Sequence, residues 1–170
     1  YKNLRPAHIP LVLRETIERT STVVLIIVAA NVFGYYMSWE RIPQMLTELL
    51  LGITQNKYVM LMIINVLLLV LGMFLEGGAA LIILAPLLVP VVKGLGVDLV
   101  HFGLVCIVNI MIGGLTPPFG SMMFTCCSIT GCELTTFVKE CIPFIIALLV
   151  ALLIVTYVPI LTMFIPNLLY

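Results

Sequence analysis

The sequence predicts an all-α protein that crosses a membrane several times, and its composition and charge spacing carry this prediction. Of the 170 residues, 62% are hydrophobic and only 9% are charged, whereas about 25% of the residues in soluble chains are charged. The charged residues are separated by long uncharged stretches at 20–39, 58–75, 77–92, 99–132 and 141–170. A helix of about 20 apolar residues spans the hydrocarbon core of a bilayer. Sixteen charged residues cannot coat a soluble domain of this size, so soluble enzymes and nucleic-acid-binding proteins are set aside. The eight basic and eight acidic residues cancel, so no net charge indicates a polyanionic partner.

The first part of the chain is expected to form a loop, a span and a surface helix. Residues 1–10 contain two prolines and two cations, which is typical of a connecting loop. A first span is expected over 11–38, with a charged, solvated start and an aromatic end at Tyr35 and Tyr36. Residues 42–51 place apolar side chains at helical spacing among polar ones. This pattern predicts an interfacial helix that lies along the membrane surface.

The stretch 58–92 contains two apolar segments joined by a glycine-bearing tip with one acid, Glu76. The residues themselves leave two arrangements open: two thin spans, or one re-entrant hairpin that enters and leaves by the same face. Pro86 and Pro90 are expected to interrupt the second segment, because proline removes a helical hydrogen bond. Asp98 follows as a candidate N-cap for the next helix.

The stretch 98–131 is longer than one span and shorter than two. Its middle reads IGGLTPPFGS, with three glycines and two adjacent prolines. Because proline lacks a backbone N–H and each glycine lowers helix propensity by about 1 kcal/mol, the helix must break there. This segment is therefore predicted to be an interrupted span. A last span is expected over 142–166, after an amphipathic lead at 132–141.

The charges also predict an orientation. Lys2, Arg5, Arg14 and Arg19 lie before the apolar run of the first span, so this end is expected to be cytoplasmic and the C-terminus external. The chain begins at Tyr1 without a leader. We therefore expect residues 1–170 to be one transmembrane fragment of a longer polytopic protein.

Two places combine a disturbed backbone with membrane depth, around Glu76 and around 112–118. Broken helices survive at that depth only where protein packs around them or an aqueous cavity meets them. The freed carbonyls suit a hard cation such as sodium, and the Thr116 hydroxyl can add an oxygen. The helix that resumes near Ser121 points its positive end at the same place, which favours an anionic substrate group. Glu76 is expected to be a cation ligand, a proton carrier or a clamp on the tip; the alternative is a simple helix cap.

Weaker signals remain open. Asn31 and Asn109 either line a pathway or form interhelical hydrogen bonds, and His101 is expected to be inert. The five cysteines lack the paired spacing of a zinc site. The sequence shows neither a nucleophile paired with a base nor a phosphate-binding loop, so no motif in it indicates an enzyme.

Two sequence motifs carry a family resemblance: LEGGAALIILAPLLVPVVKGLGVDLVHFG and, a few residues on, NIMIGGLTPPFG. In this order they resemble the C-terminal part of the large membrane subunit of tripartite ATP-independent periplasmic (TRAP) transporters. The resemblance implies an elevator-type secondary transporter built from two inverted repeats, of which this chain would be the second. It also implies that 58–92 is a re-entrant hairpin.

The resemblance further implies a sodium site, with no other metal and no assigned substrate residues. Its members would be residues of the hairpin tip and of the interrupted helix, namely Glu76, Gly77, Gly78, Ala79, Gly113, Gly114, Thr116, Pro117 and Pro118. The implied activity is sodium-coupled import of an acidic solute, of the sialic acid or C4-dicarboxylate type, across the bacterial inner membrane. The implied partners are a periplasmic substrate-binding protein, a small membrane subunit, fused or separate, and the N-terminal repeat. The rival interpretation is a structural or proton-conducting subunit of a larger membrane complex.

Overall fold

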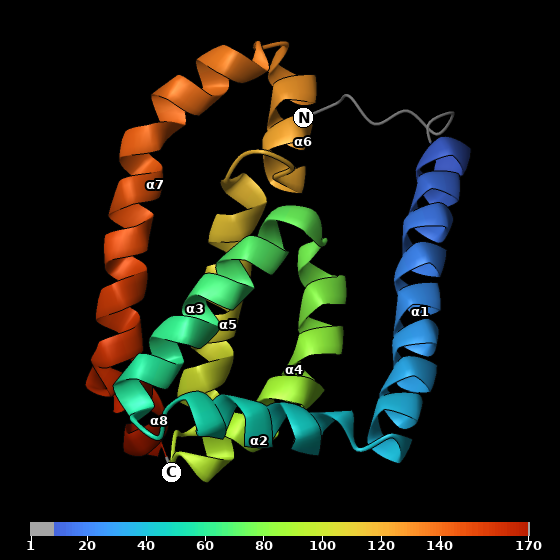
Figure 1. Cartoon of the computed structure of the whole chain (residues 1–170). Coiled ribbons are helices and arrows are strands. Elements are labelled where there is room, and N and C mark those ends of the chain that lie inside the picture. Colours follow the sequence, from blue (N-terminus) through green and yellow to red (C-terminus); the bar gives the residue numbers. More distant parts are fainter. Residues whose placement is uncertain (1–8, 170) are drawn as a thin grey trace.

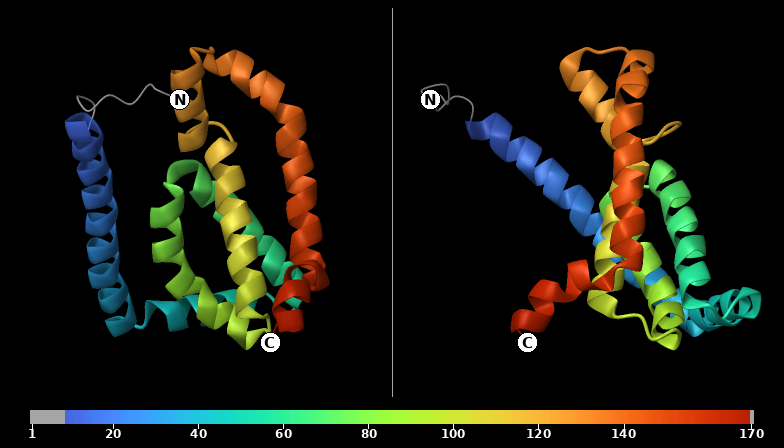
Figure 2. Two further views of the ribbon diagram at one scale, coloured as in Figure 1. Left: turned by 180° about the vertical axis from the view of Figure 1, so that it is seen from behind. Right: turned by 90° about the vertical axis from the view of Figure 1, so that its left-hand side faces the viewer.

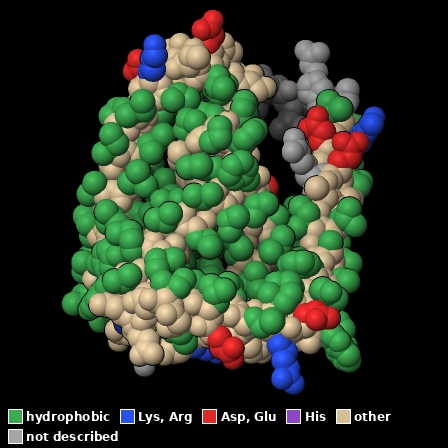
Figure 3. All heavy atoms as spheres, viewed as in Figure 1, with side chains coloured by type: hydrophobic (Ala, Val, Ile, Leu, Met, Phe, Trp, Pro, Cys, Tyr) green, Lys and Arg blue, Asp and Glu red, His purple; other side chains and the backbone are tan. Residues whose placement is uncertain are grey.

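A computed structural model describes residues 9–169, which contain eight α-helices and no strand. The helices are Ile9–Trp39 (α1), Ile42–Ile53 (α2), Lys57–Phe74 (α3), Gly77–Gly94 (α4), Leu99–Leu115 (α5), Ser121–Thr130 (α6), Leu134–Tyr157 (α7) and Pro159–Leu169 (α8). Four of them, α1, α3, α4 and α7, are long and apolar enough to cross a membrane. Charged side chains gather at two opposite ends of the space-filling view, and hydrophobic side chains cover the middle (Figure 3). The described chain is thus an all-helical, multi-pass membrane protein.

Successive long helices alternate in direction, and the tip between α3 and α4 stops short of the end where α6 and α7 meet (Figure 1). Helix α1 runs from one end to the other, where α2 lies across the base. Helices α3 and α4 rise and return as a hairpin whose open end lies beside α2. Helices α5 and α6 then cross the full height with a break between them, α7 returns, and α8 projects at the base (Figure 2).

Side-chain caps explain where three helices begin. Asp98 Oδ1 accepts hydrogen bonds from the N–H groups of Val100 and His101 at the start of α5, so the predicted N-cap is confirmed. Asn56 Oδ1 accepts one from the N–H of Tyr58 in the same way at α3. Glu76 caps α4.

The packed centre is made by α3, α4 and α5. Leu61, Leu68, Leu88 and Ile110 are each at most 2% exposed and belong to this cluster. Helix α7 packs on α5 through buried Leu152, in a second cluster, whereas most apolar side chains of α1 and α8 are exposed. The hairpin and the interrupted helix therefore form one body, and α1 leans away from it (Figure 2).

Two expectations about helices, one on continuity and one on bounds, are wrong. Pro86 and Pro90 lie inside an unbroken α4, because its buried face packs on α3 and α5 and stabilises the helix through both prolines. The helix expected over 142–166 is instead two helices. Helix α7 begins earlier and passes through Pro143, and the chain turns at Val158. Pro159 cannot continue α7 because it lacks an N–H, so it starts α8.

Candidate functional site

The first half of the candidate site is the turn between α3 and α4. Helix α3 ends with the N–H of Leu75 bonded to the carbonyl of Leu71 at 2.9 Å. Glu76 then adopts an extended backbone, and its Oε2 accepts from the N–H of Ala79 at 3.0 Å. Glu76 therefore caps α4, and its role toward a cation or proton stays a prediction. A carboxylate at a helix N-terminus also interacts favourably with the helix dipole.

The second half is the break between α5 and α6. The N–H of Thr116 donates to the carbonyl of Gly113 at 2.9 Å, and its hydroxyl donates to the carbonyl of Ile112 at 2.7 Å. Pro117 and Pro118, joined by a cis peptide bond, offer no N–H. The carbonyl of Gly114 therefore lacks the donor that a continuous helix would supply four residues later.

The freed carbonyl oxygens converge. A Cβ placed on Gly120 would lie 2.6 Å from the Gly114 oxygen and 2.9 Å from the Thr116 oxygen. Both oxygens thus lie close to Gly120, at the start of α6. The Thr116 hydroxyl, which keeps its lone pairs while donating to Ile112, adds a third hard oxygen atom to the set at the break. Such a set fits sodium, which prefers oxygen ligands.

A close glycine contact brings the tip and the break together. A Cβ on Gly113 would lie 2.8 Å from the Cα and carbonyl carbon of Gly72, so α3 and α5 touch backbone to backbone there. The tip at Leu75 and the break at Thr116 each follow this contact by three residues. Above it, the rings of Phe74 and Phe119 stack with centroids 5.3 Å apart.

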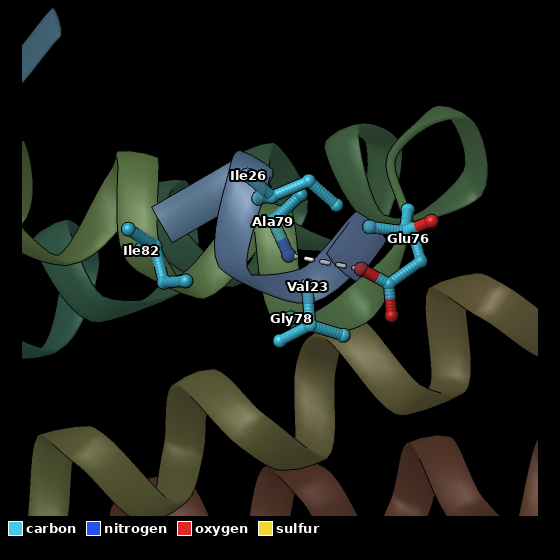
Figure 4. A pocket seen from close by; sticks show the side chains of 7 residues that line it. Val23, Ile26, Glu76, Gly78, Ala79 and Ile82 are labelled. Carbon is cyan, nitrogen blue, oxygen red and sulfur yellow. Dashed lines mark hydrogen bonds between the residues drawn. The ribbon is translucent and has the colours of Figure 1, made fainter. Parts of the chain in front are cut away.

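The tip residues divide between two sides of the hairpin. Gly77 faces α5, where a Cβ would lie 3.0 Å from Cε of Met111. The other tip residues face a cavity of about 320 Å³ between the hairpin and α1, lined by Thr22, Val23, Ile26, Glu76, Gly78, Ala79 and Ile82. Figure 4 shows the Glu76 carboxylate on this side, bonded to Ala79. Of the predicted tip residues, Gly77 is the one that contacts the interrupted helix.

A buried polar network was not predicted from the sequence, apart from one of its members. Asn109 donates from Nδ2 to Oδ1 of Asn65 at 2.9 Å, and Asn65 donates from its own Nδ2 to Oγ1 of Thr156 at 2.9 Å. Asn109 therefore forms the interhelical bond that was one of its two interpretations, whereas Asn31 bonds within α1 to the carbonyl of Ile27. An asparagine in the middle of apolar α3 was the available signal for Asn65.

His101 is also part of this buried region. Its side chain is 2% exposed, and its ring nitrogens lie 2.7 Å from Oγ1 of Thr162 and 3.2 Å from the carbonyl of Thr156. It therefore ties α5 to α7 and α8. Within residues 9–169, the structure shows no group of three or more His, Cys, Asp or Glu side chains that could hold a metal ion.

Discontinuous helices that meet at membrane depth are typical of secondary transporters as a class. Comparison with known families agrees with this class. Residues 1–161 match the family model of the tripartite ATP-independent periplasmic transporter, DctM component. The chain belongs to this family.

Curated relatives give the same result. The chain is 39% identical over 157 residues to the sialic acid TRAP transporter large permease protein SiaM of Vibrio cholerae, covering 92% of the chain and 37% of that protein. It is 41% identical over 146 residues to the isethionate TRAP transporter permease protein DctMQ of Oleidesulfovibrio alaskensis, covering 85% and 23%. It is 34% identical over 167 residues to the C4-dicarboxylate TRAP transporter large permease protein DctM of Pseudomonas aeruginosa, covering 98% and 39%. The chain thus spans less than two fifths of these relatives, which are permeases by name.

Proposed function

We propose that this chain is part of a secondary active transporter that imports an acidic organic solute together with sodium across the bacterial inner membrane. The observation that carries the proposal is the backbone contact between Gly72 and Gly113, which places the hairpin tip beside the break. In this proposal sodium is transported together with the solute. It would lie between the tip residues 76–79 and the break residues 113–118.

The oxygen atoms at the break supply the chemistry for this cargo. The carbonyls of Gly114 and Thr116 and the hydroxyl of Thr116 are the ligands that we propose, and Gly113 and the two prolines shape the loop that presents them. Glu76 holds the first turn of α4 in place from the other side of the tip. The positive end of α6 then favours the anionic group of a solute nearby.

The names of the relatives support a solute class. Sialic acid, isethionate and C4-dicarboxylates, named for the relatives, are all acids, and we propose a solute of the sialic acid or dicarboxylate type. Each positive charge that moves inward gains about 2.3 kcal/mol per 100 mV. Sodium entry therefore offsets the work of moving an anion inward against the same field.

The remaining parts of the proposal concern the whole transporter. The chain would be the second of two inverted repeats, and the N-terminal repeat would complete the site. The α3–α4 hairpin, inserted as a re-entrant unit, and the interrupted helix would move together as an elevator. A periplasmic substrate-binding protein would deliver the solute, and a small membrane subunit, fused or separate, would complete the assembly.

The test is uptake by the full-length transporter with its partners in proteoliposomes. We expect uptake of labelled sialic acid or succinate to require an inward sodium gradient and to stop when choline replaces sodium. Thr116→Val should raise the sodium concentration that gives half-maximal uptake, whereas Thr116→Ser should not. Thr125→Val is the matched control, because the Thr125 hydroxyl makes the same kind of bond, to the carbonyl of Ser121, away from the break. Sodium-independent uptake driven by a proton gradient would instead support the proton-conducting alternative.

A further inference from the structure

The buried amides of Asn65 and Asn109 form a second link between α3 and α5, below the glycine contact. Asn65, Asn109 and Thr156 are 2%, 0% and 1% exposed, and they come from three different helices, α3, α5 and α7. Such hydrogen bonds between helices hold membrane proteins together where apolar surfaces gain nothing by leaving lipid. The network therefore joins the hairpin to the interrupted helix and to α7.

The direction of every hydrogen bond in this network is fixed. Asn109 Nδ2 faces two acceptors, the carbonyl of Val105 at 2.8 Å and Oδ1 of Asn65 at 2.9 Å. Asn65 must then use its own Nδ2 toward Thr156, whose hydroxyl donates to the carbonyl of Leu152 at 2.8 Å. Because neither amide can be turned around without losing a bond, the network admits one rotation and one height of α3 against α5.

Stability alone does not explain the pair. Asn109 Oδ1 is buried and has no hydrogen-bond partner in the described part of the chain. A buried acceptor without a partner is unfavourable, and replacing both members of a buried polar pair with apolar groups is often nearly neutral. The unpaired acceptor makes the pair unfavourable for stability, so the relative position of α3 and α5 that the pair imposes explains it better.

The location of the pair indicates what it arranges. Asn109 lies one helical turn before Gly113 on the same face of α5, and Asn65 lies two turns before Gly72 on α3. The amide pair and the glycine contact therefore fix α3 and α5 at two points along one interface. Two fixed points determine where α3 ends and where α5 breaks relative to each other.

We propose that Asn65 and Asn109 are positioning residues for the sodium site between the hairpin tip and the break, with Thr156 anchoring the pair to α7. The proposal rests on the proposed function. Neither amide contacts the ion; the pair sets the distance between the tip and the carbonyls of Gly114 and Thr116. Loss of the pair should therefore weaken sodium binding more than it lowers the maximal transport rate.

The experiment uses the full-length transporter with the double substitution Asn65→Val and Asn109→Val. We expect its melting temperature in choline to stay near that of the wild type, while the sodium concentration for half-maximal thermal stabilisation and uptake rises about tenfold or more. Asn31→Val is the matched control, because this exposed asparagine bonds only within its own helix, and it should change neither value. Thr156→Val keeps the size of the side chain and should shift the sodium dependence in the same direction, by a smaller factor than the double variant. It replaces the double variant in the test if that variant does not fold.

The outcomes separate this inference from the proposed function. A wild-type transporter that responds equally to sodium and choline overturns both. A sodium-dependent wild type with unchanged sodium half-saturation in the double variant, or in Thr156→Val where the double variant fails to fold, overturns the positioning role and leaves the sodium site standing. A lower maximal rate with unchanged half-saturation does the same, because it indicates a structural pin.

Discussion

Substitution of Gly113 by alanine tests the contact that brings the hairpin to the break. The new Cβ would lie 2.8 Å from backbone atoms of Gly72 and from the carbonyl oxygen of Leu69, at least 0.6 Å inside the ordinary contact distance of 3.4 Å. Backbone atoms cannot rotate away, so α3 and α5 must separate, and overpacking of this kind costs about 1–3 kcal/mol. The matched control is Gly103→Ala in the same helix, where a Cβ meets nothing within 4 Å.

Both variants gain up to about 1 kcal/mol of helix propensity, so the difference between them isolates the clash. We expect Gly113→Ala to melt at a lower temperature in detergent than Gly103→Ala and to need more sodium for half-maximal uptake. Thermal unfolding of the two purified transporters, followed by intrinsic fluorescence with and without sodium, measures both effects. Equal stability and equal sodium dependence would show that the Gly72–Gly113 contact does not position the site.

Three further predictions concern single side chains. Gly120→Ala should abolish most sodium-dependent uptake, because its Cβ would displace the carbonyls of Gly114 and Thr116; normal uptake would remove these oxygens from the site. Glu76→Gln should keep the hydrogen bond that caps α4 and leave sodium half-saturation unchanged, while Glu76→Ala should lose about 1 kcal/mol of stability; a sodium shift in the glutamine variant would give the carboxylate charge a direct role. His101→Leu should release α8, seen as faster hydrogen exchange in 159–169 alone, since the ring bonds to α7 and α8; unchanged exchange would contradict that tie.

The sequence predicted the elements that depend on local chemistry. Long uncharged stretches gave the helices, Asp98 gave the start of α5, and the prolines at 117–118 gave its break. These features follow from the chain's own hydrogen-bonding capacity and need no tertiary partner. Local chemistry left open whether 58–92 forms two spans or one hairpin, and the hairpin was implied only by the family resemblance.

Features that depend on packing could not be predicted. Pro86 and Pro90 have the same local chemistry as the prolines at the break, but the buried face of α4 keeps the helix continuous around them. The side to which Glu76 turns depends on its bond to Ala79 and on the position of α1. The role of Gly72 as a contact point for α5 could not be predicted, because it depends on α5 lying against it.

The central claim is that the hairpin tip and the break together hold sodium. Equilibrium binding of radioactive ²²Na⁺ to the purified full-length transporter tests it most directly, with the wild type compared with Thr116→Val and the control Thr125→Val. We expect saturable binding that the Thr116 substitution weakens and the control leaves intact. Binding of equal affinity and stoichiometry in all three proteins would contradict it.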